Sequence, residues 1–128
     1  MFDSDFIIAI LERNPEAEGK IGELMKTEEQ MVITSFGVQE VVFGALGTQD
    51  RKNYERTLEF LKAFSIIGYG AESAIKAAEI QRYMGKKGAP IGVMDMMIAA
   101  VCLTHNAAII TRNTRHFSSV PGLLVEKW

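Results

Sequence analysis

Short apolar runs alternate with helical patterns along this chain. Residues 31–34, 64–67 and 108–111 are short runs with β-branched side chains, and the segments between them repeat their apolar residues at helical spacing. Strands that are separated by helices pair in parallel through right-handed crossovers, and helices then cover both faces of the sheet. The alternation predicts an α/β fold, a three-layer sandwich around a central, mostly parallel, twisted sheet of four to five short strands.

Capping signals mark where several helices begin in the first half of the chain. Asn14 before Pro15 has the order of a helix cap followed by a first-turn proline. Ser35 could cap a further helix that runs to about Leu46, directly after the second strand. These signals fit a layout in which each strand is followed by a helix.

The second half of the chain is expected to hold two long helices and two further strands. The segment 93–105 is apolar on nearly every side, as a central helix covered by its neighbours would be, and Asn106 can end it in a left-handed conformation. Strands are expected at 108–111 and 123–125. The helix before the central one carries a narrow stripe of small residues: Ala71, Ala74, Ile75 and Ala78.

Residues 1–128 are expected to form one domain, because no linker, repeat or low-complexity tract divides them. The longest apolar run is far below the ~18 residues that a membrane-spanning helix needs. The first residues lack the basic region and cleavage site of a secretory signal, and the single cysteine, Cys102, lies in an apolar segment where it would fill the core. We therefore expect a cytoplasmic protein that does not contact the membrane.

The formal net charge of -2 excludes attraction to nucleic acid by the surface as a whole. Any contact with nucleic acid must therefore be local. Two basic clusters flank segments that carry candidate site residues: Lys86 with Lys87, and Arg112 with Arg115. Solvated surface charge is the simpler interpretation of either cluster taken alone. No aromatic residues are clustered with them in the sequence, so a sequence preference cannot be predicted.

Acidic side chains follow several of the expected strands. Asp3 and Asp5 come directly before the apolar run 6–11, where a first strand would pass into a buried helix. Glu40 lies within two turns of the start of the helix after the second strand, and Asp95 falls in the first turn of the central helix. Because ligands of open parallel sheets bind beyond the carboxyl ends of the strands, these acids are expected to converge at one edge of the sheet.

Each acid has both a simpler and a functional explanation. Asp3 or Ser4 could cap the first helix, and Asp95 could complement the dipole of the central helix. Glu40 and Asp95, however, stand among mostly apolar neighbours, where an ionised carboxylate loses solvation. Mg²⁺ prefers oxygen ligands, so three converging acids predict a metal-binding acidic site, with the segment 111–113 at the same edge.

Four segments, in this order, resemble the PIN-domain family and in particular its VapC toxins. They are residues 3–8 (DSDFII), 39–44 (QEVVFG), 88–100 (GAPIGVMDMMIAA) and 110–117 (ITRNTRHF), with Pro121-Gly122-Leu123 behind the last. The third segment resembles the pattern Gly-x-x-Ile-x-x-x-Asp-x-x-Ile-Ala-Ala and is the most specific. The resemblance spans the chain and implies a PIN-like fold.

This resemblance implies a function as well as a fold. Asp3, Glu40 and Asp95 would be catalytic carboxylates that hold one or two Mg²⁺ or Mn²⁺ ions and hydrolyse RNA phosphodiester bonds. A homodimer and an inhibitory antitoxin are also implied, which would make the protein the toxin of a type II toxin–antitoxin pair. The supporting candidates are Asp5, Thr111, Asn113 and Glu79. The candidates for contact with the RNA backbone are Lys86, Lys87, Arg112 and Arg115.

The chain departs from the family pattern at the fourth acidic position. That position falls on Asn113 or His116, and neither is an acid. Asn113 could still bind an ion through its amide oxygen, whereas His116 is more simply explained as a surface residue. A site with less negative charge could hold one ion rather than two. The departure favours an alternative function, a PIN-like module that binds RNA or a partner with weak or no catalysis.

A phosphate-transferring hydrolase is a second alternative. Such enzymes also place an Asp-x-Asp pair after a first strand, and Asp3 and Asp5 would then be nucleophile and acid. No lysine sits in a comparable motif, and the short chain leaves little room for a substrate-covering cap. The sequence therefore favours the ribonuclease.

Overall fold

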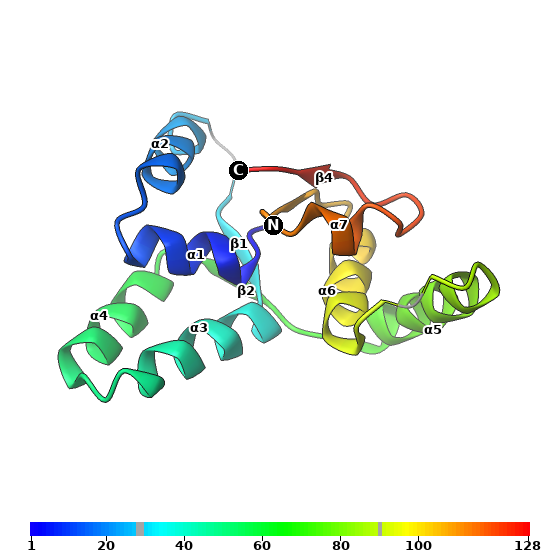
Figure 1. Ribbon diagram of the computed structural model, residues 1–128, viewed down its shortest axis with the longest axis horizontal. Coiled ribbons are helices and arrows are strands. Elements are labelled where there is room, and N and C mark those ends of the chain that lie inside the picture. The colour runs from blue at the N-terminus through cyan, green and yellow to red at the C-terminus, as the bar shows by residue number, and fades with distance from the viewer. Residues whose placement is uncertain (28–29, 90) are drawn as a thin grey trace.

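The computed structural model describes residues 1–27, 30–89 and 91–128, and places its short strands between two groups of helices (Figure 1). The strands among these residues are β1 (Val32–Thr34), β2 (Ser65–Ile67), β3 (Ile109–Ile110) and β4 (Val125–Glu126). The helices are α1 (Ser4–Leu11), α2 (Pro15–Leu24), α3 (Ser35–Gly47), α4 (Arg51–Leu61), α5 (Ala71–Lys86), α6 (Val93–Thr104) and α7 (Thr114–Phe117). The predicted α/β class is confirmed.

Phe2 joins two pairs of parallel strands. β1 pairs with β2 and β3 pairs with β4, and Phe2 forms parallel bridges to both Ile33 and Ile110. The N–H of Phe2 donates to the carbonyl of Val32 at 2.7 Å, and the N–H of Ile110 donates to the carbonyl of Met1 at 2.9 Å. The order across the sheet is therefore β2, β1, Phe2, β3, β4, and the expected first strand is reduced to the residues around Phe2.

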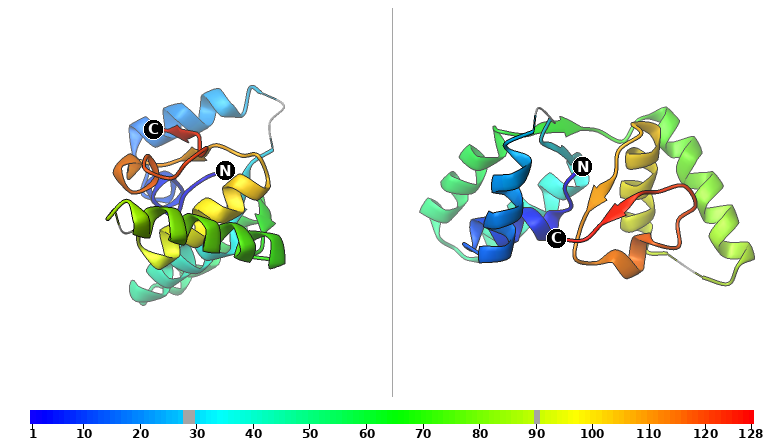
Figure 2. Two further views of the ribbon diagram at one scale, coloured as in Figure 1. Left: turned by 90° about the vertical axis from the view of Figure 1, so that its right-hand side faces the viewer. Right: turned by 90° about the horizontal axis from the view of Figure 1, so that it is seen from above.

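Helices cover both faces of this sheet (Figures 1 and 2). Ile109 belongs to an apolar cluster with residues of α5, α6 and α7, whereas its neighbour Ile110 belongs to a second cluster with residues of α1 to α4. Successive residues of a strand point to opposite faces, so the two clusters lie on opposite sides of the sheet. This arrangement confirms the predicted three-layer sandwich.

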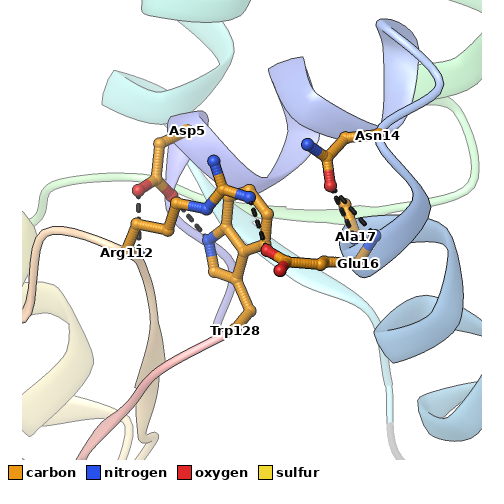
Figure 3. Close-up of polar contacts among 6 residues, drawn as sticks. All are labelled: Asp5, Asn14, Glu16, Ala17, Arg112 and Trp128. Atoms are coloured by element: carbon orange, nitrogen blue, oxygen red, sulfur yellow. Dashed lines mark hydrogen bonds and ion pairs between the residues drawn. The ribbon is translucent and has the colours of Figure 1, made fainter.

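The structure confirms two of the predicted helix ends. Asn14 Oδ1 accepts hydrogen bonds from the N–H groups of Glu16 and Ala17, and Pro15 occupies the first turn of α2 (Figure 3). Asn106 follows α6 with a φ of 51°, the left-handed conformation that asparagine tolerates well. None of the helices in the described ranges is both long enough and apolar enough to cross a membrane.

One detail of the sequence prediction is wrong. Thr34 caps α3 in place of Ser35, because the Thr34 hydroxyl oxygen accepts from the N–H of Gly37 at 3.0 Å. The small-residue stripe of α5 is exposed: Ala71, Ala74, Ile75 and Ala78. The helix packs a different face, formed by Ser73, Ala77, Ile80 and Met84. Pro90, in the predicted 88–100 segment, lies outside the described residues.

Cys102 fills the core as predicted. It is fully buried within α6, and burial raises the pKa of its thiol to about 12. A thiol that stays protonated at neutral pH is neither a nucleophile nor a metal ligand, so Cys102 is structural.

Candidate functional site

Asp3 is a buried carboxylate at the start of α1. Its Oδ1 accepts from the N–H of Ser4 at 2.9 Å, and its Oδ2 accepts from the hydroxyl of Thr111 at 2.8 Å. Only 9% of the residue is exposed, and this burial raises its pKa to about 6. The hydrogen bond from Thr111 opposes the rise in pKa, while the negative charges of Asp5 and Glu40 add to it.

Glu40 approaches Asp3 from the second turn of α3. The hydroxyl of Ser4 donates to Glu40 Oε2 at 2.6 Å, so the first residue of α1 holds the Glu40 carboxylate. Because the charge of Glu40 also raises the pKa of Asp3, the two carboxylates lie within electrostatic range of each other. The predicted approach of Glu40 to Asp3 is therefore seen in the structure.

Asp5 is held by donors from two distant parts of the chain (Figure 3). Asp5 Oδ2 accepts from the backbone N–H of Arg112 at 2.8 Å and lies 3.2 Å from the Thr111 hydroxyl. Asp5 Oδ1 accepts from the indole N–H of Trp128 at 3.2 Å. Two of these donors, the Arg112 N–H and the Trp128 indole N–H, bind Asp5 alone, whereas the Thr111 hydroxyl lies nearer to Asp3.

Asp95 reaches the same edge from the first turn of α6. Its Oδ2 lies 2.8 Å from His116 Nδ1, and that nitrogen lies 2.8 Å from the side-chain amide of Asn113. The backbone N–H of Asn113 in turn donates to the Thr111 hydroxyl at 3.0 Å. A continuous series of contacts therefore leads from Asp95 to Thr111, which donates to Asp3.

The structure links the three predicted acids without forming a preassembled metal cage. In the part of the chain that it describes, no group of three or more His, Cys, Asp or Glu side chains is arranged to hold an ion. Asp3 and Glu40 lie close together, whereas Asp95 reaches them only through the intermediate contacts. The donor chemistry nevertheless suits a hard divalent cation, because Asp3 is buried and both charged side chains that act on it are acidic.

The remaining predicted residues lie on exposed positions. Glu79 is exposed on α5, where its carboxylate pairs with Lys76 Nζ at 2.6 Å. Lys86 is in the last turn of α5, and Lys87 lies over the ring of Tyr83, with 5.0 Å between Nζ and the ring centroid. The structure gives no support for Glu79 in the site.

Arg112 and Arg115 differ in their surroundings. Arg112 pairs with Glu16 at 2.8 Å and lies over the ring of Trp128, with 3.9 Å between Cζ and the ring centroid. Arg115 is exposed on α7. The sequence-based expectation that no aromatic residue accompanies the basic clusters is therefore wrong for Arg112.

Sequence reasoning missed Ser4 and Trp128 as parts of the site. Ser4 was considered only as a cap, although a serine between two aspartates can also direct its hydroxyl at a neighbouring acid. Trp128 lies 123 residues from Asp5 in the sequence, and no local pattern connects them. Only the position of β4 beside β3 brings the two together.

Comparison with known proteins gives a consistent result. The family model for the PIN domain matches residues 1–123. The chain is 28% identical to the tRNA(fMet)-specific endonuclease VapC of Shigella flexneri, over 100% of this chain and 96% of that protein.

Two solved structures share the fold. One is VapBC2 from Rickettsia felis bound to a DNA fragment from its promoter, with a TM-score of 0.88 and 24% identity over 100% of this chain and 97% of that chain. The other is a toxin–antitoxin complex from Klebsiella pneumoniae, with a TM-score of 0.77 and 25% identity over 96% of this chain and 93% of that chain.

Proposed function

This chain belongs to the PIN-domain family, and we propose that it is a metal-dependent ribonuclease of the VapC toxin type. The observation that carries the proposal is the burial of the Asp3 carboxylate beside Asp5 and Glu40. A carboxylate with a pKa raised to about 6, next to two further acids, is poorly compensated by the protein itself. A divalent cation would supply the missing positive charge, and RNA phosphates would be drawn to it.

Asp3, Glu40 and Asp95 are the residues proposed to hold the ion. When bound, Mg²⁺ or Mn²⁺ would polarise the scissile phosphate and lower the pKa of an attacking water. The protein contributes orientation: the Thr111 hydroxyl fixes Asp3, the Ser4 hydroxyl fixes Glu40, and the His116 imidazole fixes Asp95. Asn113 completes the contacts around His116. Three carboxylates could hold one ion or two.

We propose RNA as the substrate, with a structured RNA such as a tRNA as the first one to test. The Shigella flexneri relative is named as a tRNA-specific endonuclease. The net charge of -2 means that phosphate contacts must come from local groups. Among the basic candidates, Arg112 is the one we propose for phosphate contact, because its backbone N–H donates to Asp5. Lys86, Lys87 and Arg115 remain predictions from the sequence.

An antitoxin is the proposed protein partner. The Klebsiella pneumoniae structure with the same fold is a toxin–antitoxin complex, and it aligns over 96% of this chain. An inhibitory partner that places acidic or metal-competing groups at Asp3, or that covers the carboxyl edge of the sheet, would block the proposed reaction. A homodimer remains a prediction from the family resemblance.

A binding module without catalysis is the second candidate, and one observation favours it. His116 is one of the two residues at the fourth acidic position and contacts Asp95, so a positively charged imidazole could take the place of a metal ion there. The phosphate-transferring hydrolase is less well supported. Asp5 would have to be its free acid, but the Arg112 N–H and the Trp128 indole N–H both donate to the Asp5 carboxylate.

RNA cleavage by variants of the acids separates these functions. The wild-type protein should cleave RNA with Mg²⁺ or Mn²⁺, and cleavage should disappear with EDTA, Asp3→Asn or Asp95→Asn. Glu59→Gln is the matched control, because Glu59 is an exposed acid on α4 paired with Lys62. A wild-type protein that binds RNA without cleaving it would support the binding module instead. Phosphorylation of Asp3 would support the hydrolase.

A further inference from the structure

Trp128 makes three kinds of contact beside the acidic site. Its indole N–H donates to Asp5 Oδ1 at 3.2 Å (Figure 3). Its ring carries the guanidinium of Arg112 on one face, 3.9 Å from Cζ to the ring centroid, and meets Phe6 of α1 at 60° and 5.3 Å between ring centroids. Trp128 therefore connects α1 with the segment after β3.

The contact with Trp128 determines which donors form hydrogen bonds with Asp5. Asp5 Oδ1 is bound by the indole N–H, and Asp5 Oδ2 by the N–H of Arg112 at 2.8 Å. The Thr111 hydroxyl lies 2.8 Å from Asp3 and 3.2 Å from Asp5, but it has one hydrogen to donate. Since other donors satisfy Asp5, the Thr111 hydrogen is available to Asp3.

The ring of Trp128 also orients Arg112. A guanidinium stacked flat on an indole keeps its N–H edge free for a carboxylate or a phosphate. Arg112 Nη2 now pairs with Glu16 Oε2 at 2.8 Å, and the Glu16 side chain is 75% exposed. A solvent-exposed carboxylate holds its partner weakly, so an RNA phosphate could replace Glu16 without moving the stacked guanidinium.

We propose that Trp128 is a positioning residue of the ribonuclease site. Its indole N–H fixes Asp5, which leaves the Thr111 hydroxyl to orient Asp3, and its ring holds Arg112 where the guanidinium can meet a phosphate of the RNA. This inference rests on the proposed function and adds a residue outside the acidic set. Trp128 itself contacts neither the ion nor the RNA.

Two substitutions separate the two roles of Trp128. Trp128→Phe keeps an aromatic ring for Arg112 and Phe6 but removes the N–H donor. Trp128→Leu removes both. Tyr54→Phe is the matched control, because it also removes one polar group from an aromatic side chain, but on α4 and away from the acids.

The expected results differ between kcat and KM. Trp128→Phe should lower kcat about tenfold, the loss typical of one hydrogen bond to a charged group, with KM changed less than about twofold. Trp128→Leu should lower kcat similarly and raise KM for RNA several-fold, because Arg112 loses its support. Tyr54→Phe should change neither constant.

A double-mutant cycle tests whether Trp128 acts through Asp5. In the Asp5→Ala background, Trp128→Phe should have no further effect on kcat. An undiminished tenfold loss in that background, or a kcat of Trp128→Phe equal to the wild-type value, would overturn the inference.

Mn²⁺ binding to the RNA-free protein provides a readout that does not depend on cleavage. Calorimetry should show several-fold weaker Mn²⁺ binding by Trp128→Phe, with a thermal midpoint close to that of the wild type. Trp128 is the sole tryptophan, so its indole N–H resonance should also shift when Mg²⁺ is added to the wild type. Equal Mn²⁺ affinities would overturn the role of Trp128. A wild type that binds Mn²⁺ but cleaves no RNA would refute the proposed function alone.

Discussion

Thr111 donates its hydroxyl hydrogen to Asp3 across 108 residues of sequence, with 2.8 Å between Thr111 Oγ1 and Asp3 Oδ2. The contact joins the end of β3 to the start of α1, the two points where the carboxyl ends of neighbouring parallel strands meet. Thr111 is fully buried, so its geometry does not depend on solvent. The same hydroxyl oxygen accepts from the N–H of Asn113, which connects this contact to His116 and Asp95.

Replacing Thr111 by valine should raise the pKa of Asp3 further above 6. The hydrogen bond from the hydroxyl favours the charged carboxylate, and valine has the same shape without the donor. Cleavage should fall about tenfold or more, because Asp3 loses its orientation. The pKa can be followed through the carboxyl ¹³C signal of Asp3 in a pH titration. Thr111→Ser keeps the hydroxyl and should leave the Asp3 pKa near its wild-type value; an equal shift in both variants would contradict the role of the hydroxyl.

Asp3→Asn should stabilise the metal-free protein increasingly as the pH rises. Folding raises the pKa of Asp3 from 3.8 to about 6, so the folded state binds the proton more tightly than the unfolded state. The wild type therefore keeps its full stability below pH 4 and loses about 3 kcal/mol between pH 4 and pH 7. Asparagine caps a helix as well as aspartate does and carries no charge. Urea unfolding in EDTA at pH 4.5 and pH 7.5 measures the difference, and a difference that is the same at both pH values would refute the prediction.

Divalent ions should stabilise the wild type more than the acid variants. A ligand that binds only the folded state, at a concentration 100 times its Kd, adds about 2.7 kcal/mol to the free energy of unfolding. Thermal unfolding with and without Mn²⁺ should show this gain in the wild type and in Glu59→Gln, and a much smaller gain in Asp3→Asn and Asp95→Asn. An equal gain in all four proteins would indicate that Mn²⁺ binds elsewhere.

His116→Asp should lower the free energy of unfolding of the metal-free protein and increase its affinity for the metal ion. His116 and Asp95 form a partly exposed pair, and a second carboxylate at this position would repel Asp95 instead of binding it. With Mn²⁺ present, the added acid becomes a further oxygen donor and should lower the Kd. His116→Gln is the control, because it removes the imidazole without adding charge. Calorimetric titration of both variants distinguishes these effects, and a higher Kd for His116→Asp would speak against a metal ion near His116.

The sequence was sufficient to predict the fold and to nominate Asp3, Glu40 and Asp95 as candidate site residues. Strands at 31–34, 64–67 and 108–111 were recognisable because β-branched runs alternate with helical spacing, and their parallel pairing followed from the intervening helices. Asp3, Glu40 and Asp95 were recognisable because each is an acid among apolar neighbours near the end of a strand. The pattern also located Thr111 and Asn113, since both follow β3 directly.

Features that depend on tertiary contacts could not be predicted. The sequence did not show that the N–H groups of Arg112 and Trp128 donate to Asp5 and not to Asp3. These hydrogen bonds join residues that are more than 100 positions apart in the sequence. The packing face of α5 was not predictable because several stripes of that helix are apolar and the contact with α6 selects among them. The contact between His116 and Asp95 likewise depends on where α7 meets α6.

The location of a bound ion is the most direct test of the proposal that Asp3, Glu40 and Asp95 share a divalent cation. A crystal structure grown with Mn²⁺, with the ion identified by its anomalous scattering, would show it. We expect a Mn²⁺ ion at the carboxyl edge of the sheet, with carboxylate oxygens of Asp3 and Asp95 at roughly 2 Å, Glu40 bound directly or through water, and Asp95 released from His116. A structure in which Mn²⁺ binds away from Asp3 and the contact between Asp95 and His116 persists would exclude the shared metal site.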